Sequence, residues 1–126
     1  MLERSNAYYN AALLLKNGKQ YNESVVYFYF SIFQMMMHCL TIASRPIPLH
    51  NQNPLNEDLH KWILQEIINR MDNAKKEKNF KEDFEFLCIL RYKADYQEDC
   101  VSEDECLEAE ETYNRMKNSL HLLFIK

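Results

Sequence analysis

Arg91 is the residue whose type and setting most clearly invite chemistry. It follows an apolar run that ends at Leu90, in a segment whose apolar residues recur at helical spacing. A guanidinium on a core-facing stripe needs a partner, because an unpaired buried charge is costly. Asp95 lies one helical turn further along the same face and is the expected partner. The pair predicts either a structural ion pair at one end of the fold or half of a binding or catalytic pocket, and spacing alone favours the ion pair.

Other residue types that support catalysis or metal binding lack the spacing that such sites need. Glu57-x-x-His60 matches half of a di-iron site, but the second Glu-x-x-His and the inward glutamates are missing. The single glycine excludes a phosphate-cradling loop. The histidines have no metal-ligand spacing; they are His38, His50, His60 and His121. We therefore expect no metal site and no cofactor.

The composition is that of one helical domain over residues 1–126. Apolar residues make up 47% and charged residues 27%, which is ordinary for a globular chain. One glycine and three prolines argue against an all-β fold, which needs many turns. The net charge of −4 gives no overall attraction to nucleic acid. The first residues lack the apolar segment of a signal peptide, so we expect a cytoplasmic protein with reduced cysteines.

The stretch from Val25 to Ala43 carries no charged residue and organises the rest of the chain. Its polar residues and their flanks recur at steps of three and four, which draws one narrow stripe on a helix. The stripe consists of Ser24, Tyr27, Ser31, Gln34, His38, Thr41 and Arg45. A helix that is otherwise apolar is normally buried on several sides, so we expect the central helix of a bundle, with the stripe facing water, a pocket or a second subunit.

A membrane span is the alternative interpretation of this stretch, because the uncharged run is about long enough to cross a bilayer. The line of polar side chains within it argues against a span. The stretch also lacks the basic flank that usually accompanies one. We therefore expect a core helix and no membrane.

Local signals also predict a first helix over residues 2–17 and its connection to the central helix. Gly18, the only glycine, follows the last periodic residue and is expected to end the helix in the left-handed conformation. Asn22 is the expected N-cap of the central helix. So short a link predicts that the first two helices are antiparallel neighbours.

Three further helices are expected after the proline-containing segment. The third begins near Asn56, with Glu57 and Asp58 in its first turn, and frays into the lysine-rich residues 75–78. The fourth starts around Asn79 or Phe80. The last starts at the capping box Ser102-Glu103-Asp104-Glu105. The sum is an all-α, up-down four-helix bundle, either of four long helices or with an additional short segment, the fourth helix being the shorter one.

These segments together resemble the small stand-alone prokaryotic HEPN (higher eukaryotes and prokaryotes nucleotide-binding) domains. The first two helices of that family are similar to AALLLKNGKQYNESVVYFYFSIFQMMMHCL. Leu59-His60-Lys61 resembles the His-Lys that begins the family's third helix. The family's Leu-Arg-x-x-Ala-Asp-Tyr signature is matched by Leu90-Arg91-Tyr92-Lys93-Ala94-Asp95-Tyr96. The resemblance covers nearly the whole chain, and it falls on the Arg91–Asp95 pair.

The resemblance implies a helical bundle that is often a homodimer. Many members of the family are toxin or defence ribonucleases, and others partner a minimal nucleotidyltransferase. The ribonucleases use an arginine followed after four to six residues by a histidine, whereas residues 96–98 here are Tyr, Gln and Glu. No imidazole is then expected near Arg91, and the usual general acid/base is missing.

We therefore expect a binding or partner module rather than an enzyme. Its partner would be a nucleotidyltransferase or an antitoxin, and its ligand a nucleotide or RNA. The resemblance implies a site lined by Arg91, Asp95 and Tyr96, with His60 and Lys61 as further candidates to contact phosphate or sugar. The rivals are an active ribonuclease with a non-standard site and a purely structural bundle.

Overall fold

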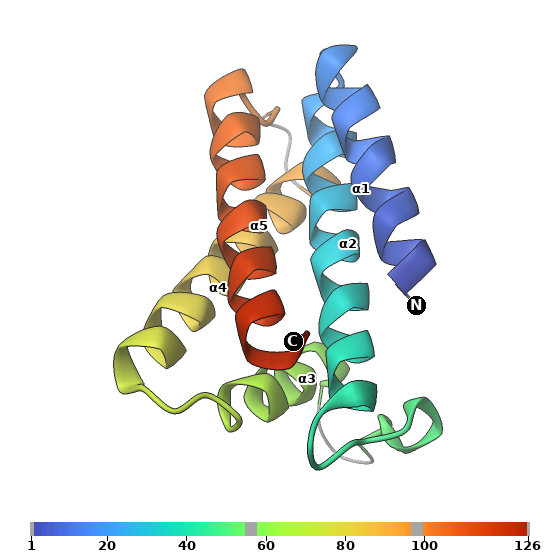
Figure 1. Ribbon diagram of the computed structural model, residues 1–126. Helices are drawn as coiled ribbons and strands as arrows, with labels where there is room; N and C mark the ends of the chain where they lie inside the picture. The colour runs from blue at the N-terminus through green and yellow to red at the C-terminus, as the bar shows by residue number, and fades with distance from the viewer. Residues whose placement is uncertain (1, 55–57, 97–99, 126) are drawn as a thin grey trace.

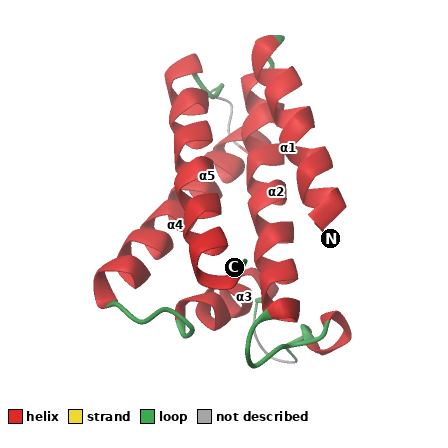
Figure 2. Cartoon of the chain, viewed as in Figure 1, coloured by secondary structure: helices red, strands yellow, loops and turns green. Residues whose placement is uncertain are grey.

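The computed structural model describes residues 2–54, 58–96 and 100–125, and it confirms the all-α bundle expected from the sequence. The helices are α1 (Leu2–Asn17), α2 (Tyr21–Ile42), α3 (Leu59–Ile68), α4 (Ala74–Tyr96) and α5 (Glu103–Phe124), with a 3₁₀-helix, η1 (Leu49–Asn51), between α2 and α3. No strand occurs among the described residues (Figure 2).

The four long helices alternate in direction, while the short α3 lies across one end of the bundle (Figure 1). The first two run antiparallel and side by side, as their short link predicts, and α4 crosses behind α5. The central position belongs to α2, which packs against each of the other four α-helices. The fold therefore places residues of α3 and α4 against the same aromatic helix.

The core is built on α2, as its uncharged sequence predicts. Phe28, Ile32 and Met36 are fully buried, and the apolar core includes residues from all five α-helices. By length and composition alone, α2 could also cross a membrane, the only described helix of which this is true. More than half of its most apolar window is buried inside the bundle, and a core helix meets the same criteria.

The polar stripe of α2 faces α1 along its first half. The Ser24 hydroxyl donates to the Ala12 carbonyl (2.8 Å), and the Ser31 hydroxyl donates to the Ser5 carbonyl (2.7 Å). Both serines are fully buried, so these two positions of the stripe face α1 rather than water, a pocket or a second subunit, whereas Tyr27 between them is partly exposed. The second half extends past the start of α1 and is partly or fully exposed; it comprises Gln34, His38, Thr41 and Arg45.

The turn after α1 forms where the sequence predicts, but its left-handed residue is not the glycine. Lys19 has a φ of 62°, whereas Gly18 has no positive φ. The N–H of Lys19 donates to the Lys16 carbonyl and that of Gln20 donates to the Leu15 carbonyl. This is the bonding pattern of a Schellman motif with Lys19 in the left-handed position, one residue later than expected.

The predicted N-cap of α2 is also wrong. The helix starts two residues earlier, with Gln20 in the cap position and without a side-chain cap bond. The Asn22 side-chain carbonyl instead accepts the backbone N–H of Val101 at 2.7 Å, which ties α2 to the residue before the α5 cap. At that cap, the predicted Ser102–Glu105 capping box is confirmed.

The predicted boundary between the third and fourth helices is wrong as well. The third ends at Ile68, and the side-chain oxygen of Asn73 accepts the N–H groups of Lys75 (2.8 Å) and Lys76 (3.2 Å) at the start of α4. The lysine-rich residues therefore begin a long fourth helix, and the third helix is the short one. Its N-cap is Asp58, while the predicted start at Asn56 and the Glu57 of the first turn lie outside the described residues.

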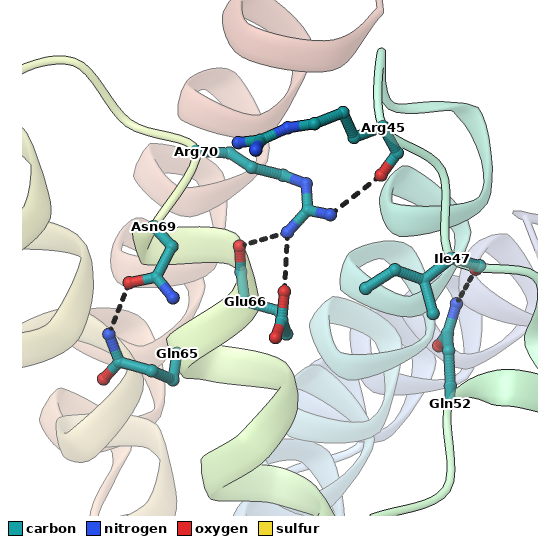
Figure 3. Close-up of polar contacts among 7 residues, drawn as sticks. All are labelled: Arg45, Ile47, Gln52, Gln65, Glu66, Asn69 and Arg70. Carbon is teal, nitrogen blue, oxygen red and sulfur yellow. Dashed lines mark hydrogen bonds and ion pairs between the residues drawn. The ribbon is translucent and has the colours of Figure 1, made fainter.

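Two polar side chains, the partly buried Arg70 and the buried Gln52, hold the proline-containing segment against the end of the bundle (Figure 3). The Arg70 guanidinium donates to the Glu66 carbonyl and carboxylate and to the Arg45 carbonyl, each at 2.8 Å. The Gln52 amide donates to the carbonyls of Met37 (3.0 Å) and Ile47 (2.9 Å). These bonds hold residues 45–52 against the ends of α2 and α3.

Candidate functional site

The predicted Arg91–Asp95 ion pair is present on the last turns of α4, but it is neither buried nor tight. The Arg91 Nε lies 3.6 Å from the Asp95 Oδ2, and the two side chains are 31% and 36% exposed. An exposed pair at this spacing contributes only about 0.3–0.5 kcal/mol. The expectation of a buried guanidinium sealed by one carboxylate is therefore wrong, and the stronger contacts of Arg91 lie elsewhere.

Those contacts are two aromatic rings of α2. The Arg91 Cζ lies 4.9 Å from the centroid of the Tyr29 ring and 5.0 Å from that of Phe30. A guanidinium over an aromatic face gains about 0.5–2 kcal/mol, depending on its exposure. The central helix thus supplies the platform on which Arg91 rests.

His60 contacts the same platform from α3. Its ring stacks on Phe33 with centroids 4.3 Å apart and on Tyr29 with centroids 5.5 Å apart. Its Nδ1 also shares a hydrogen bond with the Tyr29 hydroxyl. The expectation that no imidazole lies near Arg91 is therefore wrong, because the fold supplies one from a distant segment through Tyr29.

Burial keeps the groups around Tyr29 uncharged at neutral pH. It lowers the pKa of His60; the nearby Asp58 acts in the opposite direction, and the Arg91 charge lowers that pKa further. Burial raises the pKa of the Tyr29 hydroxyl and raises that of the Cys88 thiol to about 11. Arg91 is thus the cation of this cluster at pH 7, beside a neutral imidazole, phenol and thiol.

A hollow of about 220 Å³ opens beside the guanidinium, and Tyr29, Cys88, Arg91, Tyr92 and Tyr96 line it. Tyr92 and Tyr96 are mostly exposed, and their ring centroids lie 5.2 Å apart. The hollow is smaller than the about 300–1,000 Å³ of typical small-molecule sites, so it fits one group of a ligand rather than a whole molecule.

The structure brings together only part of the predicted site. Arg91 and Tyr96 line the hollow, and Asp95 lies beside it as the partner of Arg91. His60 contacts the platform beneath the arginine without lining the hollow. Lys61 does not line it either; its side chain is exposed, and its backbone N–H donates to Asp58.

Sequence reasoning missed three of the residues that line the hollow, Tyr29, Cys88 and Tyr92. The aromatic sequence of α2 predicted a buried helix, but it did not indicate which of its rings would contact Arg91. The arrangement supplies a cation with donors for an anionic group, exposed rings for a planar group, and a neutral imidazole behind them. Among the described residues, no three His, Cys, Asp or Glu side chains gather as they would around a metal ion.

No family model matches the chain, and no curated protein and no solved structure matches it either.

Proposed function

We propose that this chain is a HEPN-like binding module whose ligand seat is the hollow beside Arg91. The observation that carries the proposal is a part-exposed guanidinium held over two aromatic rings, with two exposed tyrosines at its side. The HEPN-like signature identified in the sequence covers the same turns of α4, which supports placing the site there.

The chemistry of the hollow favours a nucleotide or the end of an RNA. A guanidinium donates to phosphate oxygens in a fixed planar geometry. Exposed tyrosine rings stack on bases, at about 1–3 kcal/mol per base. The net charge of −4 disfavours a long polyanion, and the small volume suits one phosphate or base at a time.

Binding of nucleoside monophosphates and short single-stranded RNA, measured by calorimetry, tests this function. Arg91→Ala should weaken binding about tenfold or more, because it removes a charge-assisted contact. Arg115→Ala is the matched control, since Arg115 also pairs with a carboxylate, Asp83, but does not line this hollow. Equal losses in the two variants, or no binding by the wild type, would overturn the proposal.

RNA cleavage is the second candidate function, and the position of His60 favours it. A neutral imidazole near an arginine suits general base catalysis, and the lowered pKa keeps His60 neutral at pH 7. Purified protein should then cleave RNA, with activity lost in both Arg91→Ala and His60→Ala but kept in Arg115→Ala. Cleavage that survives the first two substitutions would arise from another site or a contaminant.

The partner expectations belong to the same proposal. We infer a homodimer, or a complex with a nucleotidyltransferase or an antitoxin, that covers the exposed face of α4 beside the hollow. A purely structural role of Arg91 predicts a different result: Arg91→Ala would lower the melting temperature without any separate loss of binding. Measuring both quantities on the same variant distinguishes the two interpretations.

A further inference from the structure

Tyr29 connects His60 and Arg91, which lie on different helices. Its ring lies under the Arg91 guanidinium, and its hydroxyl shares a hydrogen bond with the His60 Nδ1. The His60 ring is further held by its stack on Phe33. Any movement of the imidazole therefore acts on the ring that carries the arginine.

The charged and titratable groups around His60 come from each helix that packs against it. Asp58, the N-cap of α3, is ionised at neutral pH, because two backbone N–H bonds lower its pKa. On the α4 side, Arg91 carries a positive charge and Cys88 is a neutral thiol, beyond which lies the Glu85 carboxylate. From α2 comes the neutral Tyr29 hydroxyl.

We propose that His60 is a protonation-controlled latch: its neutral form fixes the Tyr29 ring beneath Arg91, and its protonation releases that ring and shifts the guanidinium. The proposal concerns regulation of the hollow, so its biological meaning rests on the proposed function, whereas the latch itself does not require a ligand.

The chemistry of the hydrogen bond gives the direction of the change. With its proton on Nε2, a neutral imidazole accepts the Tyr29 hydroxyl proton at Nδ1, whereas an imidazolium can only donate there. After protonation the hydroxyl must turn to find another acceptor beside the buried rings. The new positive charge is also partly desolvated and repelled by Arg91, and Asp58 attracts it. The imidazolium therefore favours an arrangement that moves out of the stack towards water.

The direction of the His60 pKa shift determines how the folding stability of the protein depends on pH. The pKa of His60 in the folded protein is below its ordinary value of 6.5. At pH values between the lowered pKa and 6.5, the folded protein therefore binds fewer protons at His60 than the unfolded chain does. The stability contributed by neutral His60 is fully present above pH 6.5 and is lost as the pH falls towards the lowered pKa.

The test is an NMR titration of the ligand-free full chain from about pH 7.5 to about pH 5. The ring protons of His60 should titrate with a midpoint below 6.5. The Tyr29 ring signals and the Arg91 Nε–H, which lies in the ring current of Tyr29, should follow the same midpoint. A midpoint at or above 6.5, or an Arg91 signal that ignores it, would overturn the latch.

Two variants and one control separate the latch from general effects of pH. In His60→Gln the Arg91 signal should no longer titrate in this range. Tyr29→Phe keeps the ring but lacks the hydroxyl, so it should uncouple Arg91 from His60 even if the first variant is poorly folded. In His121→Gln, which replaces an exposed histidine of α5, the coupling should be unchanged. Persistence of the Arg91 titration in both of the first two variants would contradict the proposal, whether or not nucleotides bind.

Discussion

At the scale of single residues, Ser31 shows how the bundle uses a polar side chain in its core. Its hydroxyl donates to the Ser5 carbonyl and lies 2.8 Å from the hydroxyl of Tyr113, and all three residues are fully buried. One small side chain thus joins α1, α2 and α5. Ser31 belongs to the polar stripe predicted from the sequence, and in the fold it joins three helices through buried hydrogen bonds.

Ser31→Ala should destabilise the protein by about 1–3 kcal/mol, because the Tyr113 hydroxyl loses a buried partner. Urea unfolding followed by circular dichroism measures the change. Ser119→Ala is the control, since the Ser119 hydroxyl is exposed and donates only to a carbonyl of its own helix. Similar losses of unfolding free energy in the two variants would mean that burial of the Ser31 hydroxyl does not explain the destabilisation.

Asp95 makes a second prediction at this scale, because its carboxylate shares the Arg91 guanidinium with any anionic ligand. Asp95→Asn removes a negative charge 3.6 Å from the Arg91 Nε while keeping the shape of the side chain. We expect nucleotide affinity to rise by about two- to fivefold at low salt, since the pair is partly exposed and screened. Calorimetry at two salt concentrations measures the effect, and an unchanged or lower affinity would place the phosphate away from Arg91.

At the scale of elements, the sequence expectation and the structure place the left-handed residue of the turn between α1 and α2 at different positions. If Gly18 were the left-handed residue, Gly18→Ala would be strained. In the structure Gly18 has no positive φ, and an added Cβ meets only the Leu14 and Leu15 carbonyls, at 3.5 and 3.7 Å. We therefore expect Gly18→Ala to stabilise the protein by about 0.5–1 kcal/mol, by reducing the entropy of the unfolded chain.

Lys19→Gly completes this test, because it places a glycine at the residue with the positive φ. Relief of the left-handed strain should outweigh the lost cation at the helix end, so this variant too should gain about 0.5 kcal/mol. Thermal unfolding of the two variants measures both effects. If Gly18→Ala destabilises the protein and Lys19→Gly does not stabilise it, Gly18 is the left-handed residue, as the sequence predicts.

Structural features that depend only on residues close together in the chain were predictable from the sequence. The capping box at Ser102 is formed by side chains and backbone groups within one turn, so it can be recognised without the fold. The start of α4 was missed because apolar spacing continues through Met71, which hid a turn that Asn73 closes. Periodicity marks a helical face but does not show where one helix stops and the next begins with a similar phase.

The candidate site was less predictable than the elements, for a physical reason. Arg91 and Asp95 are one turn apart, so their pairing follows from helical geometry alone. The contacts of Tyr29 with Arg91 and His60 depend on how α3 and α4 pack against α2. Nothing local to any of these residues encodes that packing, so the sequence could name Arg91 and His60 as candidates without showing that they share a ring.

At the scale of the whole molecule, one face of α4 remains uncovered next to the hollow. Ile89, Tyr92 and Tyr96 are 66%, 57% and 72% exposed, and their spacing of three and four residues places them on one stripe. Tyrosine and apolar anchors of this kind are enriched at protein interfaces. A second copy that covers this stripe would also enclose the hollow, which is too small to hold a nucleotide by itself.

We therefore expect a dimer in sedimentation velocity at micromolar concentration, and Ile89→Glu should shift it to monomer by placing a charge in the apolar part of the stripe. Leu14→Glu is the matched control, because Leu14 is 74% exposed on α1, away from this stripe, and its replacement should leave the dimer intact. If Ile89→Glu is monomeric, its nucleotide affinity also shows whether the hollow needs both copies: a loss like that of Arg91→Ala would mean that the second copy completes the seat. A wild-type monomer at the same concentration would exclude every version of the site that two chains build together.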